Sequence, residues 1–141
     1  MNTPLIDPGI RRSVLVLGSI ALVAGAATLV VAVAEGQSLL ASQGARLGTL
    51  MHLNPLGGIV TVALSAATLA AGAVGSPRLI QIAAGAWCVA AVQVIAQSGR
   101  EPNVFGGTAS TLAFFVALGA GLAALGFAPR PHASPDPEPT P

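Results

Sequence analysis

A histidine and an asparagine stand two residues apart in the stretch MHLNPLGG, residues 51–58, of a chain otherwise rich in Ala, Val, Leu and Gly. An imidazole can carry a proton or contact a ligand near neutral pH, and a carboxamide both donates and accepts hydrogen bonds. Asn54 followed by Pro55 is also a strong helix-start signal, because Asn accepts from free N–H groups and Pro at N1 loses no hydrogen bond. Helix initiation explains the asparagine. His52 is then either a tolerated residue at the membrane surface or a pH-sensitive or ligand-contacting group there.

Two glutamines one helical turn apart are the other polar side chains that need an explanation. Gln93 and Gln97 lie in an apolar segment, and an unsatisfied amide in hydrocarbon costs several kcal/mol. We therefore expect both amides to point inward and toward the outer surface of the membrane. They either bond helices to one another or, together with His52, line a small polar cavity open to the outer side.

Other kinds of chemistry lack the residues that they need. The four apolar segments contain no Asp, Glu, Lys, Arg or His, whereas proton-coupled transport ordinarily uses an ionisable group inside the membrane. Cys88 has no second cysteine to pair with and is expected to be a small buried residue. His52 and His132 stand too far apart to share a metal or a haem. We predict no catalytic residue, no metal, no cofactor and no enzyme activity, and the net charge of +1 predicts no nucleic-acid partner.

The composition indicates where these residues must lie. Hydrophobic residues make up 53% and charged residues 8% of the 141-residue chain, and the mean hydropathy is +0.78. Each of four apolar runs reaches the roughly 20 residues that a helix needs to cross a bilayer core of about 30 Å. They cover residues 13–34, 55–74, 79–97 and 108–127. Because hydrocarbon offers no partner for free backbone groups, each run must be helical. The sequence therefore predicts an all-α four-helix transmembrane bundle with up-down topology, a multi-pass protein of the plasma membrane.

The placement of arginines predicts the orientation of this bundle. Four arginines flank the ends of the helices on the side of the N-terminus, and two flank the opposite ends: Arg11, Arg12, Arg78 and Arg130 against Arg46 and Arg100. Positive charge near helix ends marks the cytoplasmic side, and the Arg11-Arg12 pair directly precedes the first helix. We therefore expect both termini in the cytoplasm.

A cleaved export signal is the alternative interpretation of residues 1–34. An arginine pair precedes the apolar run, and Ala32-Val33-Ala34 matches a signal-cleavage pattern. The run of 22 residues is, however, longer than the roughly 7 to 15 residues of a signal core. An uncleaved first transmembrane helix is the interpretation that we favour.

The connecting segments differ in length and character. Residues 1–12 form a cytoplasmic lead, and the Pro-rich residues 128–141 are predicted to be a disordered tail. The longest loop, residues 35–53, has leucines at near-helical spacing, so it lies in the interface as an amphipathic segment or forms a collapsed loop. Residues 75–78 allow only a tight antiparallel connection, and Thr108 is placed to cap the last helix.

Small residues line one face of the second helix at helical spacing. That face comprises Gly58, Thr61, Ser65, Thr68 and Gly72. Small side chains let a partner helix approach closely, and hydroxyls can bond across the contact or to their own turn. The other helices carry comparable rows: Gly18, Ala21, Gly25, Thr28 and Ala32; Ala83, Ala86, Ala90, Gln93 and Gln97; and Gly106, Ser110, Ala113, Ala117, Ala120 and Ala124. These rows predict tight packing, either within the chain or between copies.

The order of elements resembles a family of small, uncharacterised four-helix membrane proteins found in high-GC Gram-positive bacteria. The shared features are a long first loop, a start of the second helix containing His and Asn (LMHLNPLGG), a short turn, and a loop with Gly and Asn before the fourth helix (EPNVFGGTAS). The resemblance covers residues 13–127 in layout. That family carries further histidines in helices two and four, where this chain has Gly57 and Phe114. The resemblance implies a fold and no mechanism, and no site residue is carried over.

Two hypotheses for the function follow. The first is a non-catalytic accessory or scaffold component of a membrane assembly, whose partners are the lipid bilayer and other membrane proteins or further copies of itself. The second is a self-assembling passive pore or small-molecule carrier. In that case the hydroxyls of Thr61, Ser65 and Thr68 would line the path together with Gln93 and Gln97. The two hypotheses differ in where these polar groups face.

Overall fold

The computed structural model describes residues 6–49, 51–100 and 103–128. This part of the chain forms four α-helices and two short strands, in the order α1 (Pro8–Ala34), β1 (Ala45–Leu47), β2 (Met51–Leu53), α2 (Pro55–Val74), α3 (Pro77–Gln97) and α4 (Ala109–Gly126). All four helices are long and apolar enough to cross a membrane, which confirms the predicted framework of four apolar helices. The lead before Ile6 and the Pro-rich tail after Ala128 lie outside the described residues.

Three of the helices begin at a polar residue followed by proline. The pairs are Asp7-Pro8, Asn54-Pro55 and Ser76-Pro77. The carboxylate of Asp7 accepts a hydrogen bond of 2.7 Å from the amide of Gly9, and the Asn54 carboxamide accepts one of 2.8 Å from the amide of Gly57. The first helix therefore starts at Pro8, five residues before the apolar run that predicted it, because the cap and the proline act where hydrophobicity gives no signal.

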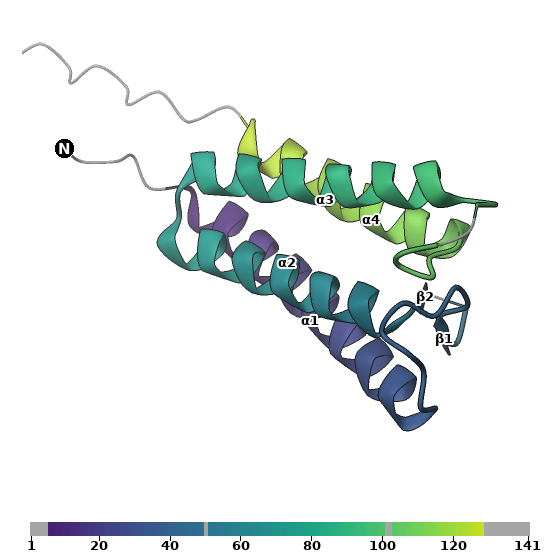
Figure 1. Cartoon of the computed structure of the whole chain (residues 1–141). Helices are drawn as coiled ribbons and strands as arrows, with labels where there is room; N and C mark the ends of the chain where they lie inside the picture. The colour runs from purple at the N-terminus through teal and green to yellow at the C-terminus, as the bar shows by residue number, and fades with distance from the viewer. Residues whose placement is uncertain (1–5, 50, 101–102, 129–141) are drawn as a thin grey trace, which may run out of the picture.

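The helices are arranged as two antiparallel pairs (Figure 1). Helix α1 packs mainly on α2, and α3 packs mainly on α4. The pairs meet at the turn Gly75–Ser76 and diverge toward the opposite end, where β1, β2 and the segment before α4 lie between them. We call these the turn end and the loop end of the bundle. Helix α1 begins and α4 ends at the turn end, as an up-down arrangement requires.

Small residues set the close approach within the first pair. The five predicted residues of the α2 face are all buried, and so is the predicted α1 row from Gly18 to Ala32. A Cβ atom added at Gly25 would lie 2.8 Å from Cγ2 of Thr61, and one added at Gly58 would lie 3.0 Å from Cβ of Leu29. No larger side chain fits between α1 and α2 at these points without a shift of one helix.

Between the pairs, larger side chains form the core. The indole of Trp87 on α3 is fully buried and packs edge-on against Phe115 of α4, with ring centroids 5.2 Å apart. Its Nε1 donates a hydrogen bond of 3.0 Å to the hydroxyl of Thr68 on α2. Met51 and Leu53 of β2 are also fully buried and extend this core to the loop end. The second strand therefore belongs to the core of the bundle.

The long first loop forms an antiparallel hairpin, which neither of the two expected arrangements included. Ala45 pairs with Leu53, Arg46 with His52, and Leu47 with Met51. Ala45, Met51 and Leu53 are buried, whereas Arg46 and His52 lie on the opposite face of the ribbon. This alternation inserts one face of the hairpin between the helix pairs and leaves the other at the surface.

Two sequence expectations about helix faces were wrong. In α4 the predicted row is exposed from Ala113 onward, and a different face is buried, formed by Thr111, Phe115, Leu118, Gly119, Leu122 and Gly126. Cys88 is exposed as well, although a buried position was expected. Ala and Gly are so frequent in these helices that small-residue spacing alone does not select a face. The bulky partners Trp87 and Phe115 decide it.

The close approach of α1 and α2 predicts the effect of one larger residue. In Gly25→Val, the added side chain meets Thr61 and the backbone of α2, so the free energy of unfolding should fall by about 1–3 kcal/mol. The matched control is Gly85→Val, because a Cβ added there has no atom within 4 Å apart from its chain neighbours and the backbone of its own helix. Thermal unfolding in detergent, followed by the fluorescence of Trp87, measures both. Equal melting temperatures for the two variants would contradict this account of the helix contact.

Candidate functional site

Asn54 ties three segments together at the loop end. Its side chain is completely buried, and its Nδ2 donates to the carbonyl oxygens of Ala41 at 3.1 Å and Val104 at 2.8 Å. Its Oδ1 accepts from Gly57, and its backbone amide donates to the carbonyl oxygen of Phe105 at 2.9 Å. One carboxamide thus joins the first loop, the start of α2 and the segment before α4, with both amide protons and the oxygen in use.

Two further side chains fasten these segments to the helices. The hydroxyl of Thr111 on α4 donates to the carbonyl oxygen of His52 at 2.8 Å and accepts from the amide of His52 at 3.0 Å. The Oε1 of Gln97, at the end of α3, accepts a 2.8 Å hydrogen bond from the amide of Val104. Strand β2 is thereby bonded to α4, and the segment before α4 is bonded to α3.

The two loops also touch at a pair of glycines. Gly106 has a φ of +61°, which disfavours any residue with a side chain, and a Cβ there would lie 2.9 Å from the backbone nitrogen of Gly44. A Cβ at Gly44 would in turn lie 2.5 Å from the carbonyl carbon of Leu53. The contact between the two loops therefore requires glycine at position 106, and the close packing of Gly44 on Leu53 requires glycine at position 44. We call the resulting assembly of residues 41–49, 51–54 and 103–108 the loop platform.

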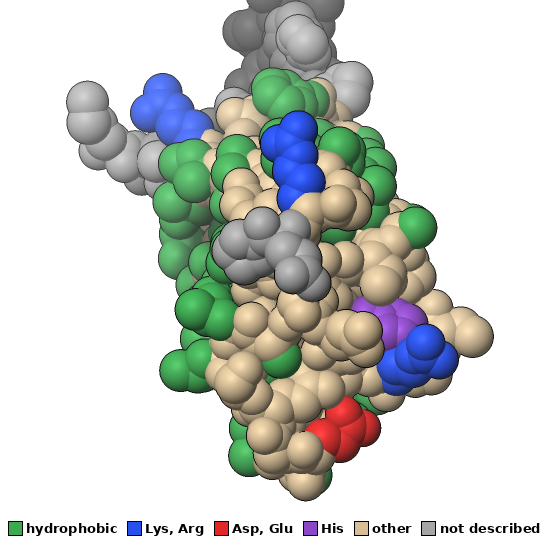
Figure 2. All heavy atoms as spheres, turned by 45° about the vertical axis from the view of Figure 1, so that its right-hand side comes forward, with side chains coloured by type: hydrophobic (Ala, Val, Ile, Leu, Met, Phe, Trp, Pro, Cys, Tyr) green, Lys and Arg blue, Asp and Glu red, His purple; other side chains and the backbone are tan. Residues whose placement is uncertain are grey.

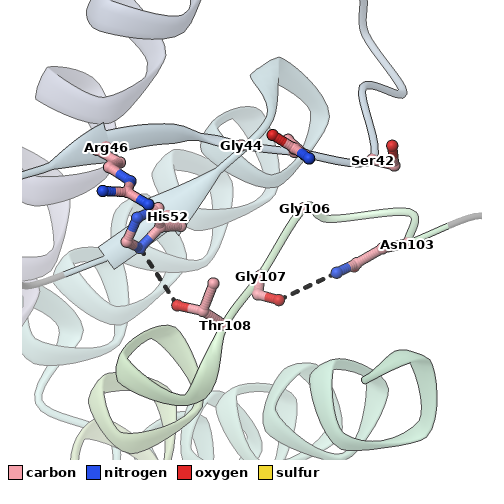
Figure 3. Close-up of a pocket in the computed structure, with 9 residues that line it drawn as sticks. Ser42, Gly44, Arg46, His52, Asn103, Gly106, Gly107 and Thr108 are labelled. Carbon is pink, nitrogen blue, oxygen red and sulfur yellow. Dashed lines mark hydrogen bonds between the residues drawn. The ribbon is translucent and has the colours of Figure 1, made fainter. Parts of the chain in front are cut away.

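A polar pocket of about 360 Å³ opens on the loop platform (Figure 3). It is lined by Ser42, Gln43, Gly44, Arg46, His52, Asn103, Gly106, Gly107 and Thr108. The Thr108 hydroxyl lies 3.3 Å from Nδ1 of His52 and 3.0 Å from the hydroxyl of Ser110, and Nδ2 of Asn103 donates to the carbonyl oxygen of Gly107 at 3.0 Å. Figure 2 shows the histidine and an arginine side by side on this surface, as the pairing of Arg46 with His52 requires.

The pocket offers several hydrogen-bond donors, and its lining also includes Asn103, whose buried Oδ1 is an acceptor without a partner among the described residues. The Arg46 guanidinium carries five N–H donors, and His52 and Thr108 each add one in a suitable protonation state or rotamer. Among the described residues, no three His, Cys, Asp or Glu side chains lie together as they do around a metal ion. The arrangement is therefore suited to holding an acceptor-rich ligand in place.

The structure separates the three residues that were expected to share a polar cavity. His52 lines the pocket, Gln97 is engaged with Val104, and Gln93 is exposed on the outer face of α3, in contrast to the expected inward orientation. The hydroxyls on the α2 face bond within their own helix. Thr61, Ser65 and Thr68 are buried, and each donates to the carbonyl oxygen one turn earlier, at 2.7 to 2.8 Å.

Sequence reasoning missed Arg46, Asn103 and Thr108 as neighbours of His52. A signal for the first of them was present, because ARL and MHL each place a polar residue between apolar ones on either side of Gly48, as a short hairpin does. In such a ribbon Arg46 and His52 fall on the same face. No local pattern indicated that the segment before α4 would close the pocket, since that contact depends on the packing of the helix pairs.

Comparison with known proteins found no matching family model, no matching curated protein and no matching solved structure. The resemblance in layout to the four-helix family therefore stays a prediction.

The role of Asn54 predicts a local loss of order in Asn54→Leu. This change leaves the carbonyl oxygens of Ala41 and Val104 and the amide of Gly57 without their partner. A buried unsatisfied group costs about 1–3 kcal/mol, so the stability should fall by at least that amount. Hydrogen exchange followed by mass spectrometry should show faster exchange in residues 41–53 and 103–107. Gln93→Leu is the control, since Gln93 is exposed, and it should leave this exchange unchanged. Unaltered protection of the loop platform in Asn54→Leu would refute the tethering role.

Proposed function

We propose that this protein is a non-catalytic, multi-pass component of the plasma membrane that acts as an accessory or scaffold subunit and presents the loop platform to a partner. The observation that carries the proposal is the burial of Asn54, whose side chain orders two loops distant in sequence. Fixing the backbone of each loop residue costs about 1–2 kcal/mol of conformational entropy. A connection that only joined helices would not need this order.

The position of the platform supports the same conclusion. Binding residues are found disproportionately on loops that a rigid framework holds in place. Here the framework is the two helix pairs, and the hairpin is anchored to it through Met51 and Leu53, both fully buried. The exposed face of the hairpin is thus a defined surface at one end of the bundle, and a partner can recognise it without ordering it first.

The hydrogen bonds of α2 favour this role over a self-assembling pore or carrier. Thr61, Ser65 and Thr68 are buried at the helix contacts, at most 1% exposed, and each hydroxyl is bonded to its own helix. A path lined by them would require α1 to separate from α2. Gln93 faces a different side of the bundle and cannot join them in the observed arrangement.

For the orientation, we propose that the turn end lies in the cytoplasm. Arg11 and Arg12 in the first turns of α1 and Arg78 at the start of α3 stand at the turn end, against Arg46 and Arg100 at the loop end. The excess of positive charge in short segments near helix ends supports a cytoplasmic turn end and an external loop platform.

Labelling of single cysteines tests this orientation. In a Cys88→Ala background, Ser42→Cys places a thiol on the exposed platform, and Ser76→Cys places one in the turn between α2 and α3. A membrane-impermeant maleimide added to intact cells should label the Ser42→Cys variant and spare the Ser76→Cys variant until the cells are opened. The reverse pattern would place the platform in the cytoplasm and overturn the proposed orientation.

Purification from the native membrane tests the accessory role. The tagged protein, extracted in mild detergent, should bring a defined partner with it in stoichiometric amount. Thr49→Arg adds a bulky charge at the exposed tip of the hairpin and should abolish this recovery. Ser13→Arg, an exposed position near the turn end, is the matched control and should retain it. If the protein is recovered only as a discrete homo-oligomer, the accessory role fails, and flux assays on the reconstituted protein become the next experiment.

A further inference from the structure

We infer that the pocket of the loop platform binds a phosphate-type oxyanion. This inference goes beyond the accessory role and does not depend on it. It rests on the convergence of Arg46, His52 and Thr108 around one cavity.

The register of the hairpin places two basic side chains next to each other. Arg46 and His52 are directly paired across β1 and β2, and both side chains line the pocket. Both side chains carry N–H groups, so an oxyanion between them can accept hydrogen bonds from both. The planar guanidinium also matches a phosphate or carboxylate group in a bidentate geometry.

The hydroxyl of Thr108 extends this set of donors. It lies 3.3 Å from Nδ1 of His52, and when it donates there, a neutral imidazole carries its proton on Nε2 and can donate to a ligand. Thr108 occupies the N-cap of α4, but its hydroxyl contacts the side chain of Ser110 and accepts from no backbone amide of the first turn, unlike Asn54 at the start of α2. The positive end of the α4 dipole adds to the attraction for an anion at this position.

The charges around the pocket are consistent with an anionic ligand. The described residues that line it include no carboxylate. Glu35 lies at the same end of the bundle, outside that lining, and its carboxylate accepts a 3.0 Å hydrogen bond from Nε2 of Gln37. The volume of about 360 Å³ lies near the lower limit of small-molecule sites, which span about 300–1,000 Å³, and accommodates a phosphate with a short substituent.

The position of the pocket relative to the bilayer allows two sources for the phosphate group. Helix α4 has 18 residues and is about 27 Å long, close to the thickness of a bilayer core, and Thr108 immediately precedes it. The pocket therefore lies at the level of lipid headgroups. A phospholipid headgroup and a free phosphate compound share the chemistry that Arg46, His52 and Thr108 recognise.

Binding to the full-length protein in a maltoside detergent, which contains no phosphate, provides the test. Isothermal titration with inorganic phosphate is compared with titration of a short-chain phosphatidylglycerol in mixed micelles. Arg46→Gln should weaken binding of the phosphate group about tenfold or more, as loss of a charge-assisted pair does. The control is Arg100→Gln, which removes an arginine at the same end of the bundle that does not line the pocket, and it should change the affinity by less than about twofold.

Each outcome has a defined meaning. If the lipid binds more tightly than inorganic phosphate and Arg46→Gln weakens it, the site is a headgroup site; equal affinities with the same dependence on Arg46 support a site for free phosphate compounds. The inference is overturned if neither probe binds the unmodified protein, or if Arg46→Gln and Arg100→Gln weaken binding equally, since binding would then reflect diffuse surface charge. A protein that binds phosphate but purifies without a partner would overturn the accessory role alone.

Discussion

The close contact of α1 with α2 is the constraint on which the rest of the structure depends. Gly25 and Gly58 let the two helices approach until side chains touch backbone, and the resulting pair has no room for a larger residue at these points. The second pair meets the first at Trp87, which packs against Phe115 of its own pair and donates a hydrogen bond to Thr68 of α2. The two helices of a pair lie side by side, whereas the two pairs diverge toward the loop end. The hairpin fills the opening between the pairs there.

The buried polar groups of the bundle form their hydrogen bonds within the chain, because the interior of the bundle offers no water. In the interior of the bundle, the hydroxyls of Thr61 and Ser65 turn back to their own helix, which satisfies them without a partner across the contact. At the loop end, Asn54 and Thr111 bond to the backbone of other segments. Apart from the bond between Trp87 and Thr68, the buried hydroxyls of α2 thus stabilise their own helix, whereas the polar groups at the loop end join separate elements.

The sequence predicted the elements of the fold better than their contacts. Hydrophobic runs located four helices, and Asn54-Pro55 located the start of α2 to the residue. The same signal at Asp7-Pro8 was overlooked, because the first turns of α1 are polar. The buried face of α4 was predicted wrongly, because alanines occur on several faces of that helix. The contact of Phe115 with Trp87 distinguishes the buried face. His52 was selected from its type, whereas Arg46 and Thr108 became its neighbours through a hairpin and a loop that meet only in the folded chain. Hydrophobic periodicity predicts single helices and strands, but it says little about contacts between segments that are distant in the sequence.

The hydrogen bonds of Asn54 and His52 join residues that are far apart in the sequence, and this affects the order in which the protein folds during synthesis. Its partner Val104 lies 50 residues downstream, and His52 is bonded to Thr111, 59 residues downstream. Chains are made and inserted from the N-terminus, so the first pair of helices is in place while these partners are still being synthesised. Until the chain has been made as far as Val104 and Thr111, one amide proton of Asn54 and the backbone groups of His52 lack these partners. The segment before α4 and the first turn of α4 thus complete a set of hydrogen bonds begun by the first loop, and a product truncated before Val104 lacks them.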